Sequence, residues 1–150
     1  EATGDWTKID AAAGQAPDGP LAAQAAEIDA GFDGEALQDV LNTLAATDSD
    51  FARSTLKKLS RNSPLAMGCA LEIIHRSRNS DNFRAALGQE YRFTYRAMQH
   101  GDFMEGIRAQ IIDKDRNPKW KHELNALPTI AVSQMLLPLG DAALTFEKGE

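Results

Sequence analysis

The sequence has little of what three large classes of protein require. A single cysteine, Cys69, excludes an internal disulfide and is compatible with a reducing compartment. No apolar run approaches the ~20 residues that a membrane-spanning helix needs. The net charge is −6, whereas binding to nucleic acid needs a basic face that neutralises phosphates. We therefore expect a soluble domain with neither a membrane nor nucleic acid as its main partner.

The beginning of the chain also lacks the usual signals. Residues 1–8 contain no initiator methionine and do not follow the basic-then-apolar order of a signal peptide. We interpret Glu1 as a boundary or a cleavage point inside a longer protein. A piece cut in this way can lack the active site of its parent.

Strand signals and internal repeats are absent too, because no window alternates apolar and polar residues between turns and no fixed period recurs. Residues 1–20 are rich in Ala, Gly and Pro, which predicts a linker or loop anchored only by Trp6 and Ile9. After it, apolar residues recur at helical spacing up to a last helix at about 129–137. The prediction is an all-α protein of about six helices, with residues 21–150 as the helical domain.

Three helices are indicated in the first half of this domain. The first has Asp33 as a possible cap, and the second begins at Asp48. Ser63 followed by Pro64 is a strong start signal for the third, which is apolar nearly all round and so predicted to be central. The predicted inward residues of the first two helices are Leu37, Val40, Leu41, Leu44, Ala52, Thr55, Leu56 and Leu59.

The longest predicted helix begins at Ser80 or Asp81 and runs to about residue 99. Gly101 can take the left-handed conformation that ends such a helix. Asp102 and Glu105, three residues apart, predict a capping box for the following helix. The predicted buried residues of these two helices are Phe83, Leu87, Tyr91, Thr94 or Tyr95, Met98, Phe103, Ile107 and Ile111.

No arrangement of nucleophile and base stands out. Cys69 lies in an apolar helix, where a lone cysteine is usually part of the core. His75, His100 and His122 are too far apart in the sequence to resemble a metal site on one helix. Glu90 lies beside Arg92, so a structural ion pair is the favoured interpretation. We therefore name no catalytic residue and no metal ligand.

One segment combines positive charge with an aromatic face. It contains Lys114, Arg116, Lys119, Trp120 and Lys121 and is broken by Pro118. An anionic ligand with an adenine ring would find there both charge and a stacking surface. The alternative is a solvated loop whose indole packs on the helices, with interleaved acidic residues that weaken the local field. From these residues alone, the solvated loop is favoured.

Residues 89–120 change that weighting. The stretch EYRFTYRAMQHGDFMEGIRAQIIDKDRNPKW closely resembles the C-terminal segment of 3-hydroxyisobutyryl-CoA hydrolases and related crotonase-superfamily enzymes. The order EYR, DF-EG-RA, IDKD and PKW is typical of that hydrolase branch, and the resemblance covers about residues 21–139. The chain departs from the pattern at residues 65–68, where the family tends to have a small polar residue, a Leu and a Lys. It departs again at His122, where the family often has proline.

The resemblance implies a parent enzyme that hydrolyses an acyl-CoA thioester in valine breakdown. Its oxyanion hole and acidic residues would lie in an N-terminal crotonase-type core, before Glu1. The helical region would cover the acyl-CoA site, pack on that core and support a homo-oligomer. It needs no cofactor beyond the coenzyme A of the substrate, whose contacts we assign to Lys114, Arg116, Lys119 and Trp120. The location would be the cytoplasm in a bacterium and the mitochondrial matrix in a eukaryote.

Two other functions remain open. One is a fragment of an enoyl-CoA hydratase or isomerase, which the acid and base placement in the missing core would distinguish. The other is a non-catalytic helical interaction module, which a native initiator methionine just before Glu1 would favour. If the chain is a fragment of the hydrolase or of a hydratase or isomerase, it should be inactive by itself. We also expect it to self-associate, or to expose an apolar patch that includes Met67, Leu71 and Ile74.

Overall fold

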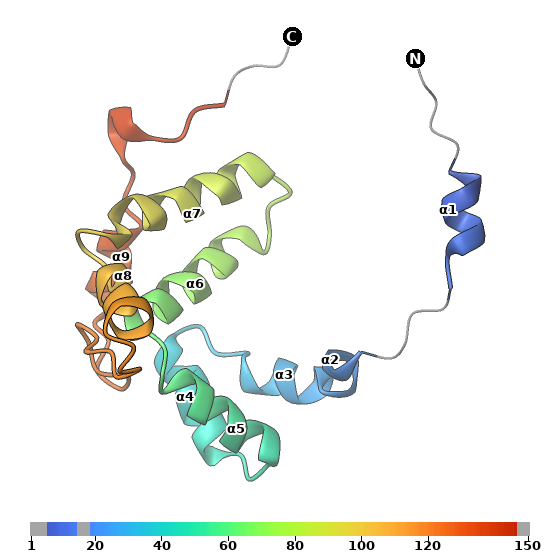
Figure 1. The fold of residues 1–150 in the computed structure, drawn as a ribbon, viewed down its shortest axis with the longest axis horizontal. Helices are drawn as coiled ribbons and strands as arrows, with labels where there is room; N and C mark the ends of the chain where they lie inside the picture. Colours follow the sequence, from blue (N-terminus) through green and yellow to red (C-terminus); the bar gives the residue numbers. More distant parts are fainter. Residues whose placement is uncertain (1–5, 15–18, 147–150) are drawn as a thin grey trace. The chain divides into compact units, whose positions relative to one another are not determined.

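The all-α prediction is confirmed for the residues that the structure describes. This computed structural model describes residues 6–14 and 19–146, which contain no strand (Figure 1). The chain divides after Ala30 into two compact units. The predicted number of about six helices was too low, because the described residues form nine α-helices, a π-helical turn and a 3-10 turn. Within the described ranges no helix has the length and apolarity to cross a membrane.

The three helices that the prediction missed all lie at the N-terminal end. They are α1 (Thr7–Ala12), α2 (Pro20–Ala23) and α3 (Ala25–Gly31). Each has only four to seven residues, too few to show a helical period in the sequence. The expected anchors, Trp6 and Ile9, are both exposed. A linker role for residues 1–20 therefore stays a prediction, and part of that segment lies outside the described residues.

The second unit begins with two short helices that pack on each other, α4 (Leu37–Ala46) and α5 (Asp50–Leu59). Their contact buries Val40, Leu44 and Ala52. Both predicted caps were displaced: Ala36 and Ser49 occupy the N-cap positions, in place of Asp33 and Asp48. The Ser49 hydroxyl accepts a hydrogen bond from the backbone amide of Ala52, while Asp48 forms an ion pair with Arg53 at the surface. The predicted inner faces of both helices nevertheless supply this cluster.

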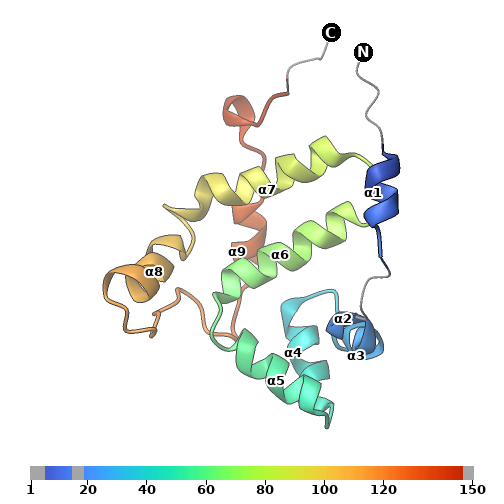
Figure 2. The same ribbon diagram turned by 45° about the vertical axis from the view of Figure 1, so that its right-hand side comes forward.

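The main core lies between α6 (Pro64–Ser77), α7 (Phe83–Ala97) and α9 (Thr129–Met135). Helices α6 and α7 lie side by side in both ribbon views, and α9 contacts both (Figure 1, Figure 2). Ser63 caps α6 as predicted, with Pro64 at its first position. A Cβ on Gly68 would come within 2.5 Å of a Leu127 methyl group and 2.9 Å of a Val132 methyl group, so a larger residue there would displace these side chains. The buried residues of this core are Leu65, Cys69, Met135 and Leu136.

The inward face of α7 was predicted only in part, since Leu87 and Tyr91 are half-buried but the other predicted residues are not. Phe83, Tyr95 and Met98 are exposed, whereas Phe93 packs against the main core and Ala97 is buried. The start was also misplaced, because Asn82, rather than Ser80 or Asp81, caps the helix. Aromatic residues lie on several faces of α7, and only contact with α6 and α9 selects the buried one.

After α7 the chain turns at Gly101 into α8 (Phe103–Ile107), which continues as a π-helical turn (Arg108–Ile112). Gly101 does not have a positive φ, so its predicted left-handed conformation was wrong. Glycine is needed at this position for steric reasons, since a Cβ on Gly101 would lie 2.8 Å from the carbonyl oxygen of Ala97. The predicted capping box is absent as well: Asp102 is the N-cap residue but makes no side-chain cap bond.

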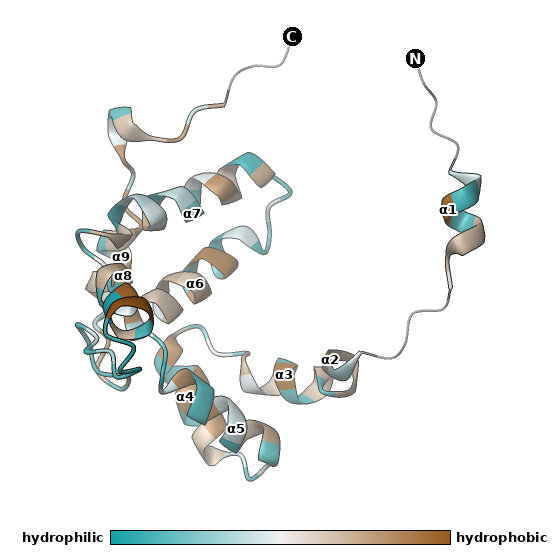
Figure 3. Cartoon of the chain, in the orientation of Figure 1, coloured by the Kyte–Doolittle hydropathy of each residue, from teal (hydrophilic) through white to brown (hydrophobic). Residues whose placement is uncertain are grey.

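The burial predicted for α8 was also wrong. Phe103 is 53% exposed and Ile111 is 65% exposed, while Ile107 is half-buried. Met104 and Ile112 are exposed as well, and strongly hydrophobic residues gather around α8 (Figure 3). Of the patch predicted on α6, Ile74 is exposed, whereas Met67 and Leu71 are half-buried. Four large apolar side chains of α8 and the π-helical turn, Phe103, Met104, Ile111 and Ile112, are thus exposed.

Candidate functional site

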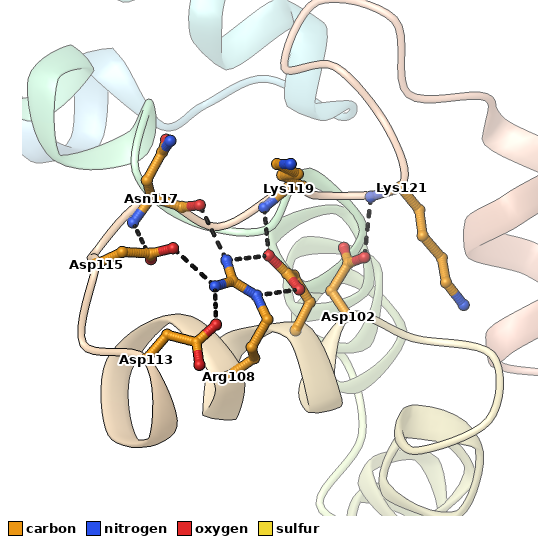
Figure 4. A network of polar contacts seen from close by, with 8 residues as sticks. Asp102, Arg108, Asp113, Asp115, Asn117, Lys119 and Lys121 are labelled. Carbon is orange, nitrogen blue, oxygen red and sulfur yellow. Dashed lines mark hydrogen bonds and ion pairs between the residues drawn. The ribbon is translucent and has the colours of Figure 1, made fainter.

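A single arginine organises the segment that follows the π-helical turn. Arg108 donates to both carboxylate oxygens of Glu105, at 2.8 and 2.9 Å. Its Nη1 also donates to Asp113 and Asp115, each at 2.7 Å (Figure 4). Nη2 donates further to the carbonyl of Asn117 at 3.2 Å. One guanidinium thus fixes three carboxylates and the return of the chain toward α8.

Glu105 is the second fixed point of this loop. Besides Arg108, its Oε1 accepts the backbone amide of Lys119 at 2.6 Å. The hydrogen bonds from Arg108, followed by that amide, lower the pKa of Glu105 from 4.5 to about 2. The same guanidinium, with the amide of Asn117, lowers the pKa of Asp115. These acidic groups stabilise the loop and are not poised for proton transfer.

Acidic and basic residues alternate along residues 113–116 of this loop. Asp113 and Asp115 point toward Arg108, and Lys114 and Arg116 between and after them have positive φ values of 57° and 54°. This left-handed backbone is uncommon for residues with a side chain. Both cationic side chains are exposed and make no ion pair among the described residues. Arg108 carries one positive charge, so it offsets part of the negative charge of the interleaved acids and holds their carboxylates in place.

Arg116 and Trp120 meet at a hollow of about 660 Å³, called here the polar hollow. Its lining includes Ser60, Arg61, Gln110, Arg116, Asn117 and Trp120. The tip of the Trp120 indole lies over Gly106, where a Cβ would be 3.8 Å from the ring. The structure therefore brings two of the four predicted contact residues together, while Lys114 and Lys119 lie outside this lining. Two guanidinium groups beside an indole suit an anionic ligand with an aromatic ring.

Sequence reasoning missed Arg61 and Gln110 in this hollow. Arg61 lies just after α5, which ends at Leu59. Nothing in its local sequence distinguishes it from Lys57 or Lys58, because its position opposite Trp120 depends on how α5 packs. Gln110 lies in the π-helical turn, whose extra residue per turn has no sequence signal that we used.

Trp120 also borders a second, apolar hollow of about 390 Å³. Its walls come from α6, α7 and α8 and include Leu65, Phe93, Phe103 and Ile107. The polar residue at its edge is Asp102, which accepts the Ser63 hydroxyl at 2.5 Å and the amide of Lys121 at 3.0 Å. This polar link joins the start of α6 to the start of α8 and to the loop.

The remaining residues considered for catalysis or metal binding lie outside these two hollows. Cys69 is buried, and burial raises the pKa of its thiol to about 12, so the prediction of a core cysteine is confirmed. His75 Nδ1 lies 3.3 Å from Glu35. Over residues 6–14 and 19–146 no group of His, Cys, Asp and Glu side chains could hold a metal ion. Glu90 forms no ion pair among these residues, which does not support the structural pair predicted for it.

Acid should loosen the loop at Glu105. Its stabilising effect is complete above pH 4.5 and is lost as the pH falls toward 2, because the folded-state pKa is lowered. The Lys119 amide, bonded to this carboxylate, should report its titration by NMR with a midpoint near pH 2. In Arg108→Met the midpoint should move toward 4.5. An unchanged midpoint in the variant would contradict the central role of Arg108.

The sequence of this chain is similar to those of known proteins. Residues 5–136 match the enoyl-CoA hydratase/isomerase family. The mitochondrial 3-hydroxyisobutyryl-CoA hydrolase of Homo sapiens is 33% identical over 95 residues, which are 63% of this chain and 24% of that protein. The chain thus spans about a quarter of the length of this curated relative.

Two solved structures are similar over nearly the whole chain. An enoyl-CoA hydratase from Rhodobacter sphaeroides 2.4.1 has a TM-score of 0.84 and 45% identity, covering 95% of this chain and 45% of that structure. A carnitinyl-CoA dehydratase from Mycobacterium thermoresistibile has a TM-score of 0.83 and 32% identity, covering 94% and 42%. The names of these relatives all refer to chemistry on CoA thioesters.

Proposed function

The chain belongs to the enoyl-CoA hydratase/isomerase family, and from this premise we propose that it is the helical part of an acyl-CoA thioester hydrolase. The proposed substrate is 3-hydroxyisobutyryl-CoA, an intermediate of valine breakdown. Its support is the identity to the human hydrolase, together with the residue order EYR, DF-EG-RA, IDKD and PKW. In a eukaryote the proposed location is the mitochondrial matrix, which the description of the human relative supports; in a bacterium it is the cytoplasm.

The part proposed for this chain is to hold the CoA portion of the substrate. The single observation that carries it is the polar hollow, where Arg116 and Arg61 flank the indole of Trp120. An adenine ring can stack on the indole while phosphates contact the guanidinium groups. Lys114 and Lys119 would add positive charge at the rim. Coenzyme A enters here as part of the substrate, with no further cofactor.

The chemistry of the reaction is assigned to a different part of the enzyme. Thioester hydrolysis needs hydrogen-bond donors for the developing oxyanion and a group for proton transfer. In the described residues the carboxylates of Glu105, Asp113 and Asp115 are paired with Arg108, and the thiol of Cys69 is buried. We assign these tasks to an N-terminal crotonase-type core of the same protein. The apolar hollow and the exposed side chains of α8 would pack on that core or on a second copy.

Binding of CoA tests the proposed contact. In a Trp6→Phe background, fluorescence of Trp120 should change as CoA is added. Arg116→Gln should weaken the affinity about fivefold, the size of one exposed charge contact of about 1 kcal/mol. Lys57→Gln, an exposed cation on α5 that is not among the lining residues of the hollow, serves as the matched control and should bind as tightly as the parent. Equal affinities for the parent and Arg116→Gln would contradict the assignment.

The chain by itself should release no thiol from 3-hydroxyisobutyryl-CoA above the buffer rate. The assay follows free thiol with a colorimetric reagent. Release that disappears when a residue of this chain is replaced would show that the catalytic groups are here after all.

A second function, hydration or dehydration of an enoyl-CoA, is favoured by the 45% identity to the Rhodobacter sphaeroides enzyme. An enzyme that contains this chain can be assayed with both substrates to decide. Thiol release from 3-hydroxyisobutyryl-CoA supports the hydrolase. Loss of the enoyl-CoA double bond without thiol release supports the hydratase.

A further inference from the structure

A third hollow, of about 500 Å³, lies between α7, α9 and the segment after Trp120. Its rim carries Arg96 from the last turn of α7, His100 just after that helix, and Lys121 and His122 from the loop. No carboxylate is among its lining residues. It shares no residue with the polar hollow, so it is a separate place on the molecule. We call it the basic hollow.

The charge of Arg96 is fixed in place without being neutralised. Its Nη1 donates to the carbonyls of Met135 at 3.0 Å and Leu137 at 2.7 Å, and its Nη2 donates to that of Pro138 at 3.3 Å. These carbonyls orient the guanidinium but carry no net charge. By contrast, Arg53, Arg76, Arg78 and Arg108 all pair with carboxylates. A guanidinium has five N–H donors, so donors remain for a ligand.

The other rim groups have no partners in the described part of the chain. The side chains of His100, Lys121 and His122 make no hydrogen bond or ion pair there. An imidazole can donate through one nitrogen even when neutral, and the lysine donates through an ammonium group. The lining of this pocket thus combines several such donors with no carboxylate, in a chain whose net charge is −6. It fits an anionic head group.

The inner wall of the basic hollow has the opposite character. It is formed by Leu65, Ala131 and Met135, and the exposed Ile130 lies at its edge. Pockets for small molecules commonly combine such apolar walls with a few polar groups that orient the ligand. A bare inorganic anion would leave this wall unused. A ligand with a charged head and a short apolar body would use both parts.

We propose that the basic hollow binds a small carboxylate with a short apolar chain, its head group on Arg96 and Lys121 and its chain against Met135 and Ile130. This ligand would bind in addition to CoA, so the proposal does not depend on the function proposed for the polar hollow. Hexanoate is a suitable probe, because it has one carboxylate and a flexible apolar chain. Hexanamide has a similar size without the charge.

The test is a titration of the chain with hexanoate, hexanamide and inorganic phosphate, followed by NMR of backbone amides. Hexanoate should bind in a saturable way and shift the amides of His100, Lys121 and His122. Lys121→Gln should weaken its affinity about tenfold, since a charge-assisted contact is lost. Ile130→Ala, at an exposed position, should weaken it about threefold. Lys57→Gln is the matched control and should leave the affinity unchanged.

Three results would overturn the proposal. Equal affinity for hexanamide would show that no anionic head group is recognised. Displacement by phosphate at the concentration at which hexanoate binds would show that the apolar wall plays no part. Unchanged hexanoate binding in both Lys121→Gln and Ile130→Ala would place any site elsewhere. Lys121 and Ile130 are both exposed, so these substitutions should leave the fold intact.

Discussion

Replacing Leu136 with alanine should lower the free energy of unfolding by about 3–4 kcal/mol, within the range of core leucine truncations. Leu136 follows α9, is 1% exposed and packs with Leu65, Cys69 and Met135. The truncation removes apolar contacts and leaves a cavity that the surrounding helices can only partly close. Urea denaturation followed by circular dichroism measures the difference.

The neighbouring residue gives a matched control. Leu137 is 52% exposed, so Leu137→Ala should change the stability by less than about 0.5 kcal/mol. The two variants remove the same atoms at adjacent positions and differ only in burial. A loss below 1 kcal/mol for Leu136→Ala would mean that α9 does not pack on α6 and α7 as described.

The second large effect is expected at Asp102. Its side chain is 8% exposed and accepts two hydrogen bonds, from the Ser63 hydroxyl and the Lys121 amide. Asp102→Ala removes both acceptors and leaves two donors poorly satisfied, which should cost about 3 kcal/mol. The same denaturation experiment measures it. Amide exchange at Lys121 should accelerate in parallel, because that amide loses its partner.

A double-mutant cycle tests whether the Ser63–Asp102 contact is responsible. Ser63→Ala alone should cost about 1 kcal/mol, since it also removes the cap of the Ala66 amide. Adding Ser63→Ala to Asp102→Ala should cost less than it does alone, because their shared hydrogen bond is already lost. Strict additivity would show that the two side chains do not interact in solution.

The features that could be predicted from the sequence are those decided by neighbouring residues. Ser63-Pro64 fixes the start of α6 locally, and the apolar period of α4 is visible without knowledge of its partners. The buried face of α7 could not be predicted in this way. Aromatic side chains occur at positions 83, 91, 93 and 95, and only contact with α6 and α9 selects Phe93.

The acidic residues of α8 show how a local rule can be overruled. Asp102 and Glu105 have the spacing of a capping box, which needs only four residues. In the structure, Arg108 offers Glu105 a two-pronged charged partner, and Lys119 adds an amide. Asp102 bonds instead to Ser63, 39 positions away. A nearby guanidinium and two groups from distant segments, the Lys119 amide and the Ser63 hydroxyl, outweigh the capping pattern here, and the spacing of the two acids cannot reveal them.

The sequence predicted the kinds of residue that line the polar hollow, but only some of the individual residues. The cluster of cations with Trp120 was visible because those residues are close in the sequence. Arg61 belongs to the same hollow but lies more than 50 positions before Arg116, at the end of a different helix. The basic hollow was missed for the same reason, since its rim residues Arg96, His100, Lys121 and His122 come from two segments more than 20 positions apart.

The π-helical turn makes the length of this region matter more than its composition. The Asp113 amide bonds to the carbonyl of Arg108, five residues back, while its carboxylate meets the guanidinium of that same residue. Deleting one residue between them would favour an ordinary α-helix, in which each position is rotated by about 100°. The loop after the turn would then leave the helix in a different direction, and Asp113 and Asp115 would no longer contact the guanidinium of Arg108. Point substitutions at exposed positions of this turn can therefore accumulate over evolution, whereas a one-codon insertion or deletion should be eliminated.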